Sequence, residues 1–203
     1  MNNTLSQALS PSNFNQMTLL ETQRNTFIKM KENQIIPSML FYGEPGTGKT
    51  ETAKLLIDDD FDCLNLNAAS ISAQNFIKTV ENYAKSSSLI STKKAMIIED
   101  VDTLSRNHQL MLKDIINKCT NICIFILTTN VISKIDSSLQ SRMCTFCFDP
   151  ASEDKDYLIS MYINNVKAIS KERNLDIDIE RAHDLAEMYF PDFRKIANMI
   201  EYR

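Results

Sequence analysis

All three glycines of this 203-residue chain lie within six positions, at Gly43, Gly46 and Gly48. Glycine is needed where the backbone adopts a positive φ or approaches another group closely. Residues 43–50 read GEPGTGKT, which fits the phosphate-binding pattern G-x-x-x-x-G-K-[ST] at every fixed position. Such a loop binds phosphates through consecutive backbone N–H groups at a helix N-terminus, where the helix dipole favours anions. An ordinary glycine turn is the alternative, but no turn requires the Lys-Thr pair.

Two side chains of this loop carry further chemistry. Lys49 would place a positive charge beside the β- and γ-phosphates, and the Thr50 hydroxyl would be a ligand of Mg²⁺. The flanking segments agree, since residues 38–42 predict a short buried strand and residues 50–57 a helix. The nucleotide-binding residues that we expect here are Glu44, Pro45, Gly46, Thr47, Gly48, Lys49, Thr50 and Glu51.

Two carboxylates follow a second predicted strand, residues 94–98, which ends in Glu99 and Asp100. One carboxylate at such a place can hold Mg²⁺ through water, and a second can orient an attacking water. The usual order in this class of ATPase is Asp then Glu, so the order here is reversed. We therefore assign Glu99 to Mg²⁺ and Asp100 to the catalytic base, and we expect slow hydrolysis. An acidic turn that caps the helix beginning near Ser105 is the alternative.

Three polar residues further along the chain could complete a hydrolytic site. Asn130 follows a buried strand, where its amide can hydrogen-bond the γ-phosphate or the attacking water. Arg142 precedes a strand of alternating polarity and could act in trans on the γ-phosphate of a neighbouring copy. Arg194 stands near the start of the last predicted helix and could fold over the nucleotide. Taken singly, the asparagine would be a loop cap and the arginines solvated surface charges.

The elements that must position these residues alternate between helix and strand over residues 1–148. This alternation predicts an α/β domain, with a parallel sheet and helices on both faces. Asp149-Pro150 marks a boundary, because the residue before proline disfavours helix. Apolar residues at helical spacing over residues 149–203 then predict a small lid of three helices. The expected strands lie near 38–42, 61–66, 94–99, 121–128 and 143–148.

Composition excludes several classes of protein. Hydrophobic residues make up 43% and charged residues 24%, which is typical of a soluble globular protein. The longest apolar run, residues 122–127, is far shorter than the ~20 residues of a membrane-spanning helix. The net charge of −4 argues against a protein that binds nucleic acid alone. Five cysteines without an export signal indicate reduced thiols in the cytoplasm, and Cys144 and Cys147 are expected in the core rather than on zinc.

Taken together, the motifs GEPGTGKT, IIEDVD, TTN, LQSR and PDFRK resemble those of AAA+ clamp-loader ATPases in order and spacing. The likeness extends from about Pro11 to the C-terminus and is strongest to the ATPase subunits of T-even-type bacteriophage clamp loaders, which are similar to replication factor C small subunits. Met143 stands where the family has Cys, and Ser10 where it has Arg. The family's small subunits continue for ~100 residues into a helical collar, a domain-sized addition. This sequence carries no collar after Arg203, so we expect either a truncated form or a different mode of assembly.

The resemblance implies a P-loop NTPase of AAA+ type that hydrolyses ATP with Mg²⁺ at the interfaces of a ring. Its implied partners are a sliding clamp, primer–template DNA and other clamp-loader subunits, in the host cytoplasm if the source is a phage, with no membrane. In the family, a Gln and a following basic residue after the acidic motif couple nucleotide to DNA. A solvated helix face is the alternative for the lysines. The DNA-binding candidates are Lys78, Lys85, Arg106, Gln109 and Lys113.

Other functions share part of this pattern. An initiator, a helicase loader or a branch-migration motor of AAA+ type would share the ATP site but not the clamp. A weakly hydrolysing assembly module would use ATP only as a structural switch, consistent with the Glu99-Asp100 order. A small-molecule kinase shares the phosphate-binding loop, but Arg142 and the helical lid fit it poorly.

Overall fold

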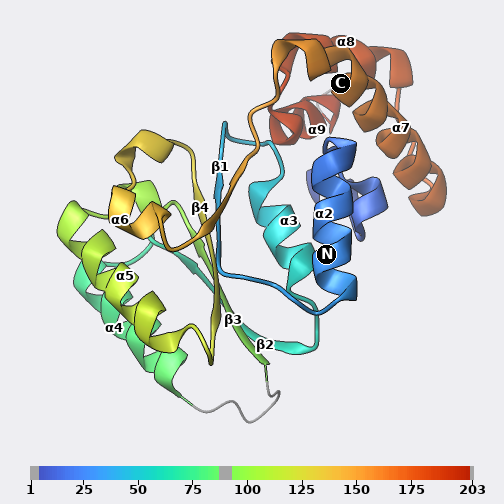
Figure 1. Ribbon diagram of the computed structural model, residues 1–203. Helices are drawn as coiled ribbons and strands as arrows, with labels where there is room; N and C mark the ends of the chain where they lie inside the picture. Colours follow the sequence, from blue (N-terminus) through green and yellow to red (C-terminus); the bar gives the residue numbers. More distant parts are fainter. Residues whose placement is uncertain (1–4, 87–92, 202–203) are drawn as a thin grey trace.

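The computed structural model describes residues 5–86 and 93–201, and within them it contains one sheet of five parallel strands (Figure 1). The strand order is β2-β3-β4-β1-β5, and each neighbouring pair is parallel. The predicted parallel α/β fold is confirmed, with strand ends shifted by a few residues at most. The strands are β1 (Met39–Tyr42), β2 (Phe61–Asn67), β3 (Lys93–Glu99), β4 (Ile124–Thr129) and β5 (Cys144–Cys147).

Helices cover both faces of the sheet, as Figure 1 shows. On one face α4 (Ala73–Lys85) and α5 (Arg106–Cys119) pack side by side. On the other lie α2 (Glu21–Glu32) and α3 (Lys49–Leu56), while the short helices α1 (Leu5–Ala8) and α6 (Ser137–Gln140) lie outside these layers. Single 3₁₀ turns occupy Phe14–Gln16, Val101–Thr103, Ile132–Lys134 and Ser152–Asp154.

The interior strand β3 is continuously apolar over residues 95–98, and its surroundings show why. Met96 and Ile98 point into the core beneath α4 and α5, whereas Ala95 and Ile97 point into the core beneath α2 and α3. Successive side chains of a strand alternate between the two faces, so a strand covered on both faces needs apolar residues at every position. This burial fixes the register of the sheet and therefore the place where its polar strand ends meet.

Three helices follow β5 in the described part of the chain, and they form the lid expected from the sequence. They are α7 (Lys155–Arg173), α8 (Ile179–Tyr189) and α9 (Phe193–Glu201). Their apolar faces make a separate hydrophobic cluster, which also contains Leu9 from the start of the chain. That residues 149–203 behave as an independent unit stays a prediction. No helix of the described residues has the length and apolarity that crossing a membrane requires.

The cysteine prediction was wrong at Cys144, which is exposed, and Cys147 is only half-buried. The reason is the position of β5, which pairs only with β1 at one edge of the sheet. An edge strand lacks a neighbour on one side, so its alternating pattern does not imply full burial. Within the described residues no cluster of three or more His, Cys, Asp or Glu residues is placed to hold a metal ion.

A candidate nucleotide site between the sheet and the lid

The phosphate-binding loop joins the buried strand β1 to the start of α3. Gly46 has φ +80° and Gly48 has φ +94°, a left-handed region that residues with a Cβ rarely adopt. α3 begins at Lys49, immediately after the last glycine. The N–H groups of its first turn have no acceptors within the helix, so they are available to an anion at this end. The special backbone requirement inferred from the clustered glycines is confirmed.

A cavity of about 360 Å³ lies between this loop, the ends of the strands and the lid. Its volume falls within the range usual for small-molecule sites. Polar groups come from the loop and from neighbouring strand ends, whereas apolar side chains come from the lid and from the segment before α2. The lining includes Pro45–Glu51 of the loop, Asn67, Glu99, Asp100 and Asn130 of the strand ends, and Arg194 of α9.

Lys49 is buried, and its ammonium donates hydrogen bonds to two carbonyls of its own loop. The Nζ–O distances are 2.6 Å to Gly43 and 2.7 Å to Glu44. Burial lowers the pKa of Lys49, because desolvation disfavours the charged form, and nearby Asp149 partly offsets this effect. Neutral carbonyls leave the positive charge without a bonded anion. A phosphate would supply one.

Glu44 does not belong to the lining of the cavity, contrary to the sequence-based expectation. Its side chain is exposed, and its backbone N–H donates to Asp149 Oδ1 at 2.5 Å. Its carbonyl accepts from Thr47 Oγ1 at 2.8 Å as well as from Lys49. Glu44 therefore holds the shape of the loop from outside, because its own polar backbone groups are already paired.

The two residues expected to hold Mg²⁺ lie together. Thr50 Oγ1 donates to Glu99 Oε2 at 3.0 Å, although 49 residues separate them. A hydroxyl and a carboxylate at the phosphate end of the cavity are the hard oxygen donors that Mg²⁺ prefers, and Mg²⁺ usually takes its remaining ligands from water and phosphate. The residues present thus fit the ion.

Asp100 has an unusual backbone and a partner that the sequence reading missed. Its φ of +57° lies in the left-handed region, and its Oδ2 accepts from Asn67 Nδ2 at 2.7 Å. Asn67 ends β2, next to Glu99 at the end of β3 in the parallel register. A polar residue at the end of the predicted strand 61–66 was the available signal. The asparagine holds the carboxylate that we expect to act on water.

Asn130 and Arg194 also line the cavity, but Arg142 does not. Asn130 follows β4, whose partner β1 leads into the loop. Arg194 is exposed at the start of α9, and its charge further lowers the pKa of Lys49. Arg142 is exposed just before β5, which runs parallel to β1, so it lies at the end of the sheet opposite the loop. It cannot complete the site of its own chain.

Four DNA-binding candidates are surface cations on α4 and α5. Lys78 is exposed, and Lys85 pairs with Glu81 at 2.6 Å. Arg106 pairs with Asp136 at 2.9 Å while its side chain is 82% exposed. Lys113 lies 3.4 Å from the neighbouring Asp114. They remain candidates, since α4 and α5 lie side by side on one face of the molecule.

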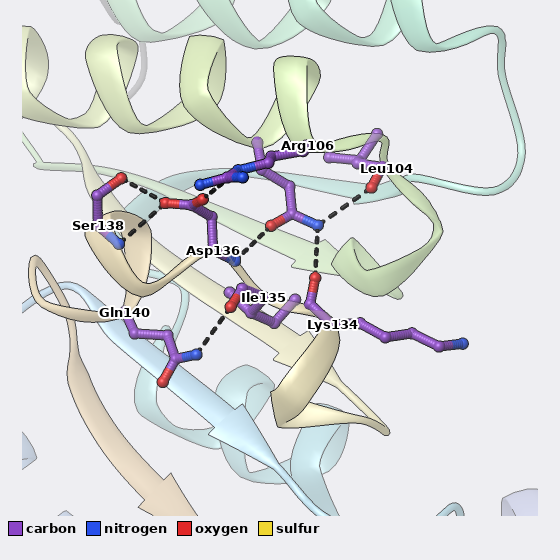
Figure 2. A network of polar contacts seen from close by, with 8 residues as sticks. Leu104, Arg106, Lys134, Ile135, Asp136, Ser138 and Gln140 are labelled. Atoms are coloured by element: carbon purple, nitrogen blue, oxygen red, sulfur yellow. Dashed lines mark hydrogen bonds and ion pairs between the residues drawn. The ribbon is translucent and has the colours of Figure 1, made fainter.

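Gln109 is a different case, because its side chain is only 2% exposed. Its amide nitrogen donates to the carbonyls of Leu104 (3.1 Å) and Lys134 (3.0 Å), and its amide oxygen accepts from the N–H of Asp136 (2.7 Å). Figure 2 shows the surrounding network, in which Asp136 also meets Ser138 and Arg106. Gln109 is therefore not placed to contact DNA, contrary to expectation. It fastens α5 to the segment before α6.

Comparison with known proteins agrees with this geometry. A parallel sheet with a phosphate-binding loop after the interior strand β1, and acidic residues at the end of β3 on the far side of β4, defines a P-loop nucleotide-binding protein. Residues 39–150 match the model of the ATPase family associated with various cellular activities (AAA). That match covers more than half of the chain, so the chain belongs to the AAA family.

Among AAA proteins, the chain is similar in sequence to subunits of replication factor C. The chain is 28% identical to a probable replication factor C subunit 5 of Dictyostelium discoideum, over 94% of the chain and 56% of the relative. It is 29% identical to the replication factor C small subunit of Methanococcus maripaludis, over 84% of the chain and 55% of the relative. The chain thus spans about half the length of the curated relatives it matches.

Two solved structures share the fold. A RuvB variant of Thermotoga maritima superposes with a TM-score of 0.69 at 15% identity, covering 96% of this chain and 64% of that one. The ORC1 protein of Aeropyrum pernix, solved in complex with DNA, superposes with a TM-score of 0.63 at 13% identity. The match covers 97% of this chain and 62% of that one.

Proposed function

We propose that this chain is an ATP-hydrolysing subunit of a sliding-clamp loader. The observation that carries the proposal is the convergence of the phosphate-binding loop, the Thr50–Glu99 pair and Arg194 on one cavity. Similarity to replication factor C small subunits over most of the chain supports the choice of clamp loading among AAA functions. The proposed partners are a sliding clamp, primer–template DNA and further loader subunits in the cytoplasm.

In this proposal the loop binds the triphosphate of ATP through backbone N–H groups and Lys49, whose ammonium exchanges carbonyl partners for phosphate oxygens. Thr50 and Glu99 would hold Mg²⁺, which when bound neutralises charge on the β- and γ-phosphate oxygens. Asp100, held by Asn67, orients the attacking water and accepts its proton. Asn130 hydrogen-bonds the same water or the γ-phosphate.

Two arginines would link hydrolysis to movement and assembly. Arg194 contacts the triphosphate from α9, so the lid would respond to the presence of the γ-phosphate. Arg142 reaches the γ-phosphate of the adjacent subunit and stabilises charge in the transition state. Hydrolysis would therefore depend on ring assembly, and ATP-bound rings would open the clamp and hold primer–template DNA. Because the base is the shorter aspartate, we expect slow turnover.

Binding and hydrolysis can be tested separately on this chain. Lys49→Ala should weaken ATP binding at least about tenfold, a loss of ~1.4 kcal/mol, in isothermal titration calorimetry. The exposed Lys29 on α2 supplies the matched control, since Lys29→Ala should bind ATP normally. Asp100→Asn should bind ATP but lose about 10²-fold or more of single-turnover hydrolysis, the contribution of a general base. Equal rates for Asp100→Asn and the natural chain would instead support a non-hydrolysing assembly module.

Testing the proposed clamp loading requires the assembled complex. With companion loader subunits present, primed DNA and clamp should stimulate steady-state ATP hydrolysis. No stimulation under these conditions would refute clamp loading while leaving nucleotide binding intact. Stimulation by a helicase rather than a clamp would support a helicase-loading AAA protein.

A further inference from the structure

The segment before α2, residues 7–18, connects the two parts of the molecule; we call it the N-terminal strap. Leu9 is buried in the hydrophobic cluster of the lid helices. Phe14 and Met17 are buried in the cluster formed by the sheet with α2 and α3. α1, which overlaps the start of the strap, also contacts α9. The strap thus packs against the lid at one end and against the sheet layer at the other.

The strap forms one wall of the cavity. Its lining residues are Gln7, Leu9, Ser10, Pro11, Gln16, Met17 and Thr18. Helix α7 of the lid contributes Tyr162, Asn165, Val166 and Ile169. These residues are apolar or uncharged, unlike the loop with its lysine and helix N-terminus. An uncharged wall suits a heterocyclic base and its sugar, whereas the phosphates belong beside the loop.

Arg173, the last residue of α7, fastens the strap to the lid. Its Nη1 donates to the carbonyl of Ala8, and its Nη2 donates to the carbonyl of Ser10 at 3.4 Å. These two carbonyls flank Leu9, the strap residue that is buried in the lid. A guanidinium presents several donors in one fixed plane, so a single side chain can bind two carbonyls that stand two residues apart. Charged donors also make stronger hydrogen bonds than neutral ones.

Two other hydrogen bonds join the strap to the lid, and in both the donor is an uncharged amide and the distance is long. Gln16 Nε2 donates to Glu172 Oε2 at 3.4 Å, and Asn165 Nδ2 donates to Thr18 Oγ1 at 3.5 Å. Both distances exceed the usual range of N–H···O bonds, as does the distance from Arg173 to Ser10, so the bond from Arg173 to Ala8 is the short one of these four. Arg173, in contrast, contributes a charged donor to the contacts between the strap and α7.

We infer that Arg173 is a positioning residue for the nucleoside half of the substrate. By holding Ala8 and Ser10 it keeps the strap closed over the cavity, so it sets the affinity for base and sugar but not for phosphates. The inference rests on the proposed nucleotide binding. A plain structural alternative is a cation that merely interacts with the dipole at the end of α7. Lys171 lies in the same last turn and distinguishes the two, because it is exposed like Arg173 but makes no hydrogen bond to the described residues of the strap.

The test compares two ligands, ATP and inorganic tripolyphosphate, on the full chain by calorimetry. Arg173→Ala should weaken ATP binding about tenfold, which is ~1.4 kcal/mol, and change tripolyphosphate binding by less than about twofold. Arg173→Lys keeps the charge but lacks the planar pair of donors, so its ATP affinity should be intermediate. The matched control Lys171→Ala should bind both ligands as the natural chain does.

Hydrogen exchange supplies a readout that does not depend on affinity. In Arg173→Ala without ligand, amides of residues 8–18 should exchange faster, while those of residues 43–51 keep their natural rates. Arg173→Lys should show a smaller change of the same kind, which keeps the test decisive if the alanine variant folds poorly.

Several outcomes would overturn the inference. An unchanged ATP affinity in Arg173→Ala, an equal loss for both ligands, or the same loss in Lys171→Ala would each contradict it. Failure of the natural chain to bind ATP or tripolyphosphate would refute the proposed function together with this inference. If the natural chain binds both ligands and Arg173→Ala leaves the ratio of the ATP and tripolyphosphate affinities unchanged, this inference alone is refuted.

Discussion

Lys49 is the side chain whose electrostatic environment would change most when a phosphate enters the loop. Its pKa is lowered mainly by burial and also by the nearby charge of Arg194, while Asp149, Asp100 and Asp102 act in the opposite direction. Neutral carbonyls are its hydrogen-bond partners. A bound phosphate would favour the charged ammonium and raise its pKa again. Proton uptake is therefore expected to accompany nucleotide binding at alkaline pH.

This shift predicts the pH dependence of binding. Without nucleotide, the pKa of Lys49 lies below the ordinary lysine value of 10.5. As the pH rises, ATP affinity should therefore begin to fall at a lower pH than it would if Lys49 had an ordinary pKa. Lys49→Arg should remove this alkaline fall, since a guanidinium stays protonated. Calorimetry from pH 7 upward, with circular dichroism as a control for folding, measures the effect. The same alkaline fall in both proteins would contradict the assignment to Lys49.

At the scale of elements, the phosphate-binding loop and the lid are in direct contact. A Cβ built on Gly46 would lie 1.9 Å from Asp192 Oδ1, so the loop passes directly against the start of α9. Asp192 also accepts from the N–H of Lys195 at 2.9 Å, capping that helix. Asp149, where the sheet ends and the lid begins, accepts from the N–H of Glu44. A change in the loop must therefore move the lid or break these contacts.

Gly46→Ala tests this coupling. The new Cβ would collide with Asp192 and would also require φ near +80°, which costs ~1–2 kcal/mol for a residue with a side chain. ATP affinity should fall by more than tenfold. Asp192→Ala in the same chain should restore only part of it, because the backbone strain remains. A double-mutant cycle on ATP dissociation constants measures the coupling. Additive effects of the two substitutions would show that loop and lid do not interact.

At the scale of the whole molecule, the catalytic residues proposed here lie at two distant places. The cavity opens where the loop, the strand ends and the lid meet, whereas Arg142 is exposed at the opposite end of the sheet. Gln109 and Asp136 tie the helix after the acidic residues to the segment that leads to α6 and Arg142 (Figure 2). Such a chain presents the nucleotide cavity on one surface and the arginine for a neighbour's cavity on another. This arrangement suits assembly in a ring.

Complementation between inactive variants tests this arrangement. Lys49→Ala removes the nucleotide site but keeps Arg142, and Arg142→Ala does the reverse. Each alone should show strongly reduced ATP hydrolysis in the assembled loader, and a mixture should recover activity because some interfaces pair an intact cavity with an intact arginine. Hydrolysis by an isolated, monomeric Arg142→Ala chain at the natural rate would contradict action in trans. The exposed Lys29→Ala variant again serves as the control.

Local features were readable from the sequence. The glycines, Lys49 and Thr50 are consecutive in the chain, and their chemistry depends on a turn and a helix start that neighbouring residues determine. Alternating strands and helices predicted a parallel sheet, and parallel strands bring the ends of β1, β3 and β4 to one edge. The meeting of Thr50 with Glu99 follows from that rule, because both lie at this edge.

Other features depended on contacts between distant segments. The partnership of Asn67 with Asp100 requires β2 beside β3, and the exposure of Cys144 requires β5 at an edge, which no local pattern specifies. Gln109 looks like any polar residue of a helix until the segment before α6 covers it. The elements and the loop could thus be predicted from local patterns, since backbone propensity and side-chain periodicity act over a few residues. Tertiary structure alone decided which polar groups are buried, paired or free, because burial depends on what packs against a segment from elsewhere in the chain.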